Sequence, residues 1–336
     1  MSSHTLIANE TPFATLTPDL ILNAVEAQGF FCDGRTYPLN SYENRVYQVG
    51  IEDSSPIIAK FYRQARWQRI QIEEEHAFCN ELFEADIAVA APIANPETRA
   101  TLFERCGFHY ALFARFRGDA PDTEDLDQLY TLGQKLGQLH NVGARTNFKH
   151  RETLTPQLLG ELSISTQLNQ SFIPARLQAS YNDVGQALLK RIQNQWLKYP
   201  ATTIRLHGDC HRSNILWNDN EPLFVDFDDA RNGPAVQDLW MLLSGDRPQQ
   251  NLQLSTLLEG YEEYRDFNRN ELRLIESLRS LRMLHYASWL ANRQNDPAFK
   301  IAFPGFGGDT YWQQHINDLK HQLIALENPP LLDGNF

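Results

Sequence analysis

The sequence has no long apolar run, no export-signal pattern and no excess of positive charge. No stretch approaches the ~20 apolar residues needed to span a bilayer, and the first residues lack the basic-then-apolar pattern of a signal peptide. Lysine and arginine total 30 against 42 aspartates and glutamates, a net charge of -12. General nucleic-acid binding needs a basic face. We therefore expect a cytoplasmic protein with no membrane and no nucleic-acid partner.

Cysteine is scarce as well. The four cysteines, Cys32, Cys79, Cys106 and Cys210, show no paired spacing, and we expect them to be reduced thiols. Cys210 adjoins a candidate catalytic aspartate and has two interpretations. It is either a redox-sensing thiol or a small packed side chain in the loop, and we favour the second.

The chain has 336 residues, of which 42% are hydrophobic and 21% charged. These values are ordinary for a soluble globular protein with one large or two smaller domains. Periodicity predicts strands at 45–51 and 57–62, a hairpin over 101–116, and helices at 17–29, 67–85, 125–143, 184–200, 272–290 and 311–326. Residues 151–180 are weakly patterned.

Two polar strings flank a further predicted hairpin. Residues 206–214 read LHGDCHRSN and residues 223–229 read LFVDFDD, with an apolar run and a turn between them. A hairpin returns the end of its second strand to the start of its first, so Asp209, Asn214 and Asp226 are expected to converge. Carboxylate and amide oxygens suit Mg²⁺ better than zinc. Phosphoryl transfer needs such a set, in which one carboxylate orients the attacking hydroxyl and an Asn and a second Asp hold metal.

This spacing resembles the catalytic loop and metal aspartate of the protein-kinase superfamily. His-Gly-Asp for His-Arg-Asp, and Asp-Phe-Asp for Asp-Phe-Gly, are similar to the aminoglycoside phosphotransferase and choline kinase branch. The strings at 39–47 (LNSYENRVY) and 229–240 (DARNGPAVQDLW) resemble the stress response kinase A family, bacterial serine/threonine protein kinases of that branch.

The resemblance implies an α+β, bilobal protein-kinase-like fold. A small antiparallel-sheet N-lobe would occupy residues 1–116 and a mainly helical C-lobe residues 117–336. It also implies that Asp238 holds the backbone of the catalytic loop. Asp228 stands where protein kinases have glycine, and no Ala-Pro-Glu string follows. We therefore expect a less mobile metal loop without switching by activation-loop phosphorylation.

Three residues of the N-terminal part are candidates for nucleotide binding. Lys60 lies inside an apolar strand, where a buried ammonium is costly unless paired. The resemblance implies the ATP phosphates and a helix glutamate as its partners. The helical wheel does not choose between Glu74 and Glu75, and the family spacing to Phe78 favours Glu75. The loop before residue 45 contains no glycine, and the resemblance implies that Ser41 contacts ATP.

The predicted chemistry is transfer of the ATP γ-phosphoryl group to a hydroxyl with Mg²⁺. Asp209 and Asp226 are the candidate catalytic residues, and Asn214 and Asp226 the metal ligands. A rival transition-metal site from His207, Asp209 and His211 is disfavoured because no second His/Cys cluster completes it. His140 is expected to be structural.

Three functional classes follow. The one we favour is a monomeric, autophosphorylating kinase that acts on Ser/Thr hydroxyls of proteins, in a family associated with stress response and protection from stress-induced cell death. The second is a small-molecule kinase for an aminoglycoside, amino alcohol or homoserine-like substrate. Its acidic pocket would come from Asp119, Asp122, Glu124 and Asp125. The third, a pseudokinase or binding module, is disfavoured because Lys60, Asp209, Asn214 and Asp226 are all present.

Overall fold

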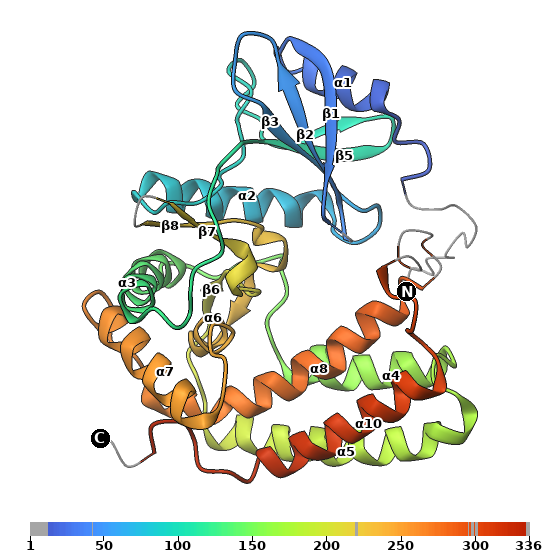
Figure 1. Ribbon diagram of the computed structural model, residues 1–336, viewed down its shortest axis with the longest axis vertical. Coiled ribbons are helices and arrows are strands. Elements are labelled where there is room, and N and C mark those ends of the chain that lie inside the picture. Colours follow the sequence, from blue (N-terminus) through green and yellow to red (C-terminus); the bar gives the residue numbers. More distant parts are fainter. Residues whose placement is uncertain are drawn as a thin grey trace. The chain divides into compact units, whose positions relative to one another are not determined.

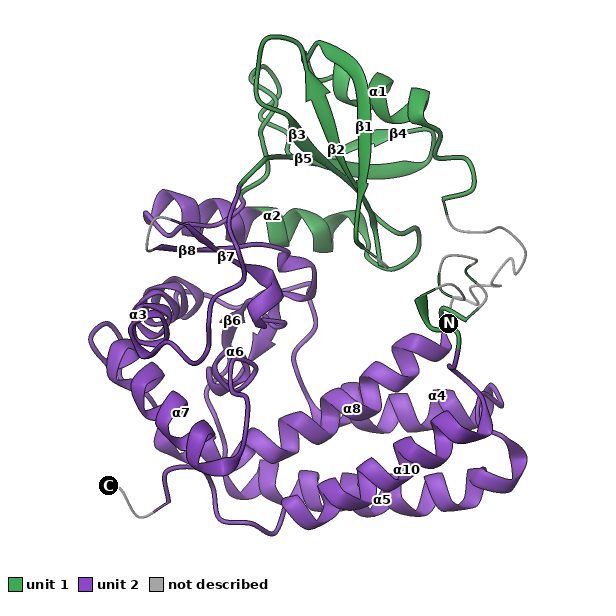
Figure 2. Cartoon of the chain, in the orientation of Figure 1, with its two compact units in different colours: residues 1–76, 91–116, 293–304 green, residues 77–90, 117–292, 305–336 purple. Residues whose placement is uncertain are grey.

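The computed structural model describes residues 13–41, 43–218, 221–294, 296, 299 and 302–333. Its contacts divide the chain into two compact units (Figure 2). Unit 1 comprises residues 1–76, 91–116 and 293–304, and unit 2 comprises residues 77–90, 117–292 and 305–336. One boundary between the units falls after Phe116. Residues 77–90 precede this boundary but belong to unit 2, and residues 293–304 follow it but belong to unit 1. The assignment of nucleotide binding to residues 1–116 and catalysis to residues 117–336 stays a prediction.

Unit 1 is built on a five-stranded antiparallel sheet in the order β1-β2-β3-β5-β4 (Figure 1). Its strands are β1 Cys32–Leu39, β2 Arg45–Ile51, β3 Ile57–Phe61, β4 Phe103–Arg105 and β5 Phe108–Ala114. The β4–β5 hairpin turns at Cys106 and Gly107, whose φ angles of 49° and 80° suit a tight two-residue turn. The sequence did not predict β1. It is an edge strand that contains glycine and proline and is mostly exposed, so it lacks the usual strand pattern.

Helix α1, Pro18–Glu26, packs beside β1 and supplies Ile21, Ala24 and Val25 to the core of unit 1. Its start is the one that the sequence predicted, because the Thr17 side chain accepts a hydrogen bond from the backbone N–H of Leu20 at 3.3 Å. The Tyr110 hydroxyl on β5 donates to the carbonyl oxygen of Ala24 at 2.8 Å, which ties the helix to the sheet.

Helix α2 runs from Arg69 to Glu84, close to the predicted bounds. The predicted apolar stripe was wrong at Ile70, which is 43% exposed, whereas Ile72 is buried. The buried face also contains Glu75, which is 2% exposed. A carboxylate on the inner face of a helix breaks the apolar pattern from which the stripe was read.

Unit 2 is mainly helical. Its helices are α3 Leu126–Gly143, α4 Leu162–Asn169, α5 Ala175–Lys198, α6 Val236–Trp240, α7 Arg247–Glu262, α8 Ile275–Ala291 and α10 Asp309–Ala325. Helices α4, α5, α8 and α10 pack together as a bundle (Figure 1). Four of the five leucines of the predicted stripe on α3 are fully buried, at positions 129, 132, 136 and 139. The stripe was wrong at Leu126, the first residue of the helix, which is 38% exposed.

Several helices differ from the predictions. Helix α7 was not predicted, and α5 begins at Ala175, well before the predicted start at residue 184. The helix expected from residue 272 begins as a 3-10 segment, Arg269–Leu274, before α8. Helix α4 was not predicted, and a π-helical turn, Gln157–Glu161, precedes it. The inner face of α4 includes Ser163 and Gln167, and the Gln167 side chain donates to the carbonyl oxygen of Leu284 at 3.3 Å. Buried polar residues of this kind hide an amphipathic pattern.

Two short antiparallel pairs complete unit 2. Strand β6, Ile204–Leu206, pairs with β9, Arg231–Gly233, and β7, Ile215–Asn218, pairs with β8, Glu221–Phe224. Within the part of the chain that the structure describes, no helix is both long enough and apolar enough to cross a membrane.

Glycines let α3 and α7 approach closely. A Cβ on Gly133 would overlap the carbonyl oxygen of Leu257, and one on Gly260 would overlap that of Tyr130. We predict that Gly133→Ala lowers the free energy of unfolding by about 1–3 kcal/mol, because the α7 backbone at Leu257 cannot move away from the new methyl group as easily as a side chain can.

The control is Gly185→Ala on α5, whose Cβ would meet only the end of the Ile164 side chain at 3.1 Å. It should be nearly neutral, since alanine is the better helix former. Urea titrations compare the two variants, and equal effects would contradict the packing argument.

Candidate active site

The β7–β8 hairpin gathers the three predicted oxygen-bearing residues. Its pairing extends past β8, where the Val225 N–H donates to the carbonyl oxygen of Asn214 at 2.9 Å. The Asn214 amide in turn donates to the carbonyl oxygen of Asp209 at 3.0 Å. Asp226 follows Val225 directly, so one hydrogen-bonded unit carries Asp209, Asn214 and Asp226. The turn residues 219 and 220 lie outside the described residues.

Asp226 adopts a left-handed conformation with φ 61° and ψ 62°, which is uncommon for a residue other than glycine. The 3-10 turn Phe227–Asp229 follows it. The buried Arg151 guanidinium donates to the carbonyl oxygen of Asp228 at 3.1 and 3.2 Å and to that of Ala230 at 2.9 Å. These bonds fix the segment that carries Asp226. Sequence reasoning missed Arg151, which lies at the edge of the weakly patterned stretch.

A buried carboxylate holds the catalytic loop. Asp238, on α6, accepts hydrogen bonds from the backbone N–H groups of His207 at 2.8 Å and Gly208 at 2.9 Å. His140 Nε2 lies 3.1 Å from the same carboxylate, and its Nδ1 lies 3.0 Å from the Tyr261 hydroxyl. Asp238 and His140 are fully buried. This is the loop-holding role expected for Asp238 and the structural role expected for His140.

The glycine of His-Gly-Asp is required by the backbone. Gly208 has a φ of 85°, and a Cβ there would overlap the carbonyl oxygen of Asp229. An arginine at this position, as in His-Arg-Asp, would therefore collide with the segment that follows Asp226.

Asp209 is held by two cationic or donor groups. Arg282 Nη1, on α8, donates to Asp209 Oδ1 at 2.5 Å, and His211 Nε2 lies 3.3 Å from Oδ2. Burial alone would raise the pKa of Asp209, but the His211 hydrogen bond and the Arg282 charge outweigh it and hold the pKa well below its usual value. Asp209 is therefore ionised at neutral pH. Sequence reasoning did not find Arg282, which lies 73 residues away.

The donor set fits a hard cation. Because the Asn214 amide nitrogen is used toward Asp209, its oxygen is left for a ligand, and Asp226 adds an exposed carboxylate. The rival zinc site gains no support. Both ring nitrogens of His207 contact backbone atoms, the carbonyl oxygen of Val225 at 2.8 Å and the N–H of Asp209 at 3.4 Å. Among the described residues, no group of three His, Cys, Asp or Glu is arranged to hold a metal.

Lys60 and Glu75, predicted to pair, are both buried in unit 1. Lys60 is 6% exposed on β3, with its ammonium 5.3 Å from the centre of the Tyr62 ring. The Tyr62 hydroxyl lies 2.8 Å from Nε2 of His76, the residue after Glu75. This contact brings the Glu75 turn of α2 to the end of β3. Glu74 is only half-buried, so burial favours Glu75, and the pairing itself stays a prediction.

The loop between β1 and β2 contains the half-buried Ser41 and is anchored by charge. Glu43 forms ion pairs with Arg63 at 3.3 Å, with Arg66 at 3.6 Å and with Arg293. The Asn44 side chain accepts a hydrogen bond from the Arg63 N–H at 3.0 Å. Sequence reasoning missed this cluster, although it noted that the loop has no glycine. Side-chain contacts of Glu43 and Asn44 therefore hold the described C-terminal end of this loop.

Cys210 is completely buried, and burial raises the pKa of its thiol. A redox-sensing cysteine needs access and thiolate character. The structure therefore favours the interpretation of Cys210 as a packed side chain.

Comparison with known proteins identifies the chain's relatives. Residues 36–275 match the phosphotransferase enzyme family. The chain is 43% identical over 325 residues to the serine/threonine protein kinase RdoA of Salmonella typhimurium. The alignment covers 96% of this chain and 97% of that protein. The chain is 42% identical to stress response kinase A of Escherichia coli K12, with 95% and 96% covered. The chain belongs to the stress response kinase A family. The sequence-based resemblance is confirmed.

Solved structures share the fold at lower identity. An amicoumacin kinase in complex with AMP-PNP and Ca²⁺ aligns with a TM-score of 0.66 at 17% identity, covering 88% of this chain and 92% of that one. A microcompartment-associated aminopropanol kinase aligns with a TM-score of 0.66 at 19% identity, covering 90% and 96%. The predicted fold class, a sheet-based N-terminal part and a helical C-terminal part of kinase type, is confirmed.

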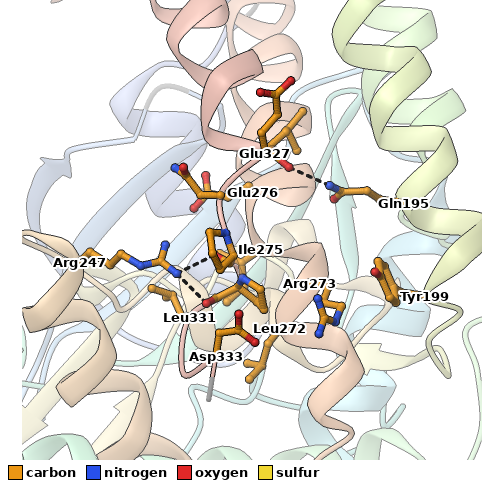
Figure 3. A pocket seen from close by; sticks show the side chains of 14 residues that line it. Gln195, Tyr199, Arg247, Leu272, Arg273, Ile275, Glu276, Glu327, Leu331 and Asp333 are labelled. Atoms are coloured by element: carbon orange, nitrogen blue, oxygen red, sulfur yellow. Dashed lines mark hydrogen bonds between the residues drawn. The ribbon is translucent and has the colours of Figure 1, made fainter. Parts of the chain in front are cut away.

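A cavity of about 350 Å³ lies elsewhere in unit 2 of this family member (Figure 3). The C-terminal segment forms one wall, where the Arg247 guanidinium donates to the carbonyl oxygens of Pro329 and Pro330 at 2.6 Å. Arg273 lies over the Tyr199 ring at 5.2 Å. None of the lining residues is a predicted site residue. The two Arg247 hydrogen bonds hold the C-terminal segment against the start of α7.

Glu271 connects α6 to the 3-10 segment before α8. Its side chain accepts a hydrogen bond from the N–H of Val236, the first residue of α6, at 3.0 Å. Burial raises the pKa of Glu271 from 4.5 to about 7. The folded state therefore keeps this proton up to about pH 7, whereas the unfolded chain releases it near 4.5. The resulting stabilisation is complete below 4.5 and is lost as the pH rises through 7.

We predict that Glu271→Gln, which keeps the acceptor without the charge, removes this loss. When the pH is raised from about 5 to about 8, the free energy of unfolding of the variant should increase by about 1–3 kcal/mol relative to that of the wild type. The exposed Glu259→Gln serves as control and should track the wild type. Urea titrations at the two pH values measure the difference, and parallel curves for all three proteins would argue against a raised pKa.

Proposed function

We propose that this protein is an ATP- and Mg²⁺-dependent serine/threonine protein kinase that acts in bacterial stress response. The observation that carries the proposal is the single hydrogen-bonded unit of Asp209, Asn214 and Asp226, in a chain of the stress response kinase A family. We further propose that the protein autophosphorylates, works as a cytoplasmic monomer and protects the cell from stress-induced death.

In this proposal Asp209 orients the acceptor hydroxyl and takes its proton. The acceptor oxygen bonds to the γ-phosphorus as the bond to the β–γ bridging oxygen breaks, and ADP leaves. Asn214 and Asp226 hold the Mg²⁺, which when bound neutralises charge on the phosphate oxygens. Lys60, supported by Glu75, binds the α- and β-phosphates, and Ser41 contacts the nucleotide from its loop.

The geometry gives less support to a cationic small-molecule acceptor. Two of the four acidic residues expected to bind one are used locally. Asp125 caps α3 by accepting hydrogen bonds from the N–H groups of Asp127 and Gln128, and Asp122 accepts one from the N–H of Glu124. The Asp125 carboxylate caps α3, and the Asp122 carboxylate stabilises the turn that precedes it.

The acceptor class can be tested with purified protein, Mg²⁺ and labelled ATP. We expect label on serine or threonine of the protein itself or of proteins in a cell extract, as located by mass spectrometry. Asp209→Asn should still be stabilised thermally by Mg-ATP but lose turnover by about a hundredfold or more. Label found only on choline, homoserine or kanamycin would replace the protein-kinase proposal by the small-molecule one.

A second experiment tests the metal ligand. Asp226→Ala should raise the Mg²⁺ concentration needed for half-maximal nucleotide binding by about tenfold or more, because one carboxylate ligand is lost. Asp229→Asn is the control, since Asp229 pairs with Arg231 at 2.8 Å. An unchanged Mg²⁺ titration for Asp226→Ala would remove this residue from the metal site.

A further inference from the structure

The ion pair between Arg282 and Asp209 lies at the proposed reaction centre. Both Asp209 oxygens are engaged, Oδ1 by Arg282 at 2.5 Å and Oδ2 by His211 at 3.3 Å. The Arg282 side chain is 40% exposed and that of Asp209 is 21% exposed. An acceptor hydroxyl therefore reaches the proposed base next to an exposed guanidinium.

The face of α8 that carries Arg282 continues with aromatic side chains. Tyr286 and Trp289 follow four and seven residues later, so they share this face. Their rings stack at 5.7 Å with 12° between the planes, and Tyr286 is 45% exposed. A cation and then an aromatic platform thus lead away from Asp209 along one helix.

This chemistry selects among hydroxyl acceptors. An ammonium close to the reacting hydroxyl would be placed beside the Arg282 guanidinium, and like charges repel. A carboxylate in the same position can form the two parallel hydrogen bonds that a guanidinium favours. It can also replace Asp209 as the partner of Arg282, which leaves Asp209 Oδ1 for the hydroxyl proton.

We propose that Arg282 is the acceptor-specificity residue, and that it selects Ser/Thr hydroxyls flanked by acidic residues by exchanging its ion pair with Asp209 for one with the acceptor. The inference rests on the proposed protein-kinase function. Tyr286 and Trp289 form the surface on which the acceptor chain lies. Recognition of the acceptor and release of the base are then one event.

The test uses the full chain with Mg-ATP and three synthetic peptides that differ only in the residues on each side of one serine, which are aspartate, alanine or lysine. For the wild type, kcat/KM for the aspartate peptide should exceed that for the lysine peptide by about tenfold or more. Arg282→Gln should flatten this ratio, and Arg282→Glu should invert it. A merely structural role of Arg282 would lower all three rates together.

Arg279→Gln is the matched control. Arg279 lies one turn earlier on α8, with its guanidinium 5.2 Å from the Trp240 ring centre and 3.3 Å from Glu276. Its peptide ratio should equal that of the wild type. The inference would be overturned if Arg282→Glu left the ratio of kcat/KM between the aspartate and lysine peptides unchanged, or if it raised only the KM for ATP. The kinase proposal would stand in either case. A wild type that labels no protein or peptide at all would instead defeat the proposed function.

Discussion

The buried carboxylate of Asp238 is the interaction on which the rest of the candidate site depends. Removing a carboxylate from water is costly unless hydrogen bonds replace the lost hydration. Asp238 obtains them from the N–H groups of His207 and Gly208 and from His140. Its own helix is held at the first residue by Glu271. Helices of unit 2 thereby determine the position of the catalytic loop before any ligand binds.

The segment that carries the proposed metal aspartate is fixed just as firmly. Arg151 bonds to the carbonyl oxygens on both sides of Asp229, and Gly208 lets the loop approach Asp229 closely. This agrees with the expectation from Asp228, which replaces the glycine that allows protein kinases to swing this segment. A segment with these bonds is poorly suited to act as a switch.

Local strings and periodicity were sufficient to predict the β7–β8 hairpin, four of the five leucines in the α3 stripe, the residues of the oxygen-rich set and, through resemblance, the family. They did not reveal the partners that hold these residues. Arg151 and Arg282 donate to oxygen atoms of residues at least 73 positions away in the sequence. Glu43 pairs with several arginines at one carboxylate. Such contacts leave no periodic signal, because only the tertiary fold brings the two charges together. Helix α4 was missed for a related reason, since its inner face contains polar residues.

The low pKa of Asp209 bears on what this residue can contribute. A carboxylate stabilised by His211 and Arg282 is a weak base, so it gains little by removing a proton early. Phosphoryl transfer asks little of a base in most analyses, because its transition state is loose and catalysis comes mainly from positioning and electrostatics. In the proposed mechanism Asp209 therefore contributes mainly by directing the acceptor hydroxyl. Arg282 and His211 hold the two Asp209 oxygens before the acceptor binds. In the proposed exchange Arg282 then pairs with the acceptor, so it affects the position of the acceptor as well as the choice of its charge.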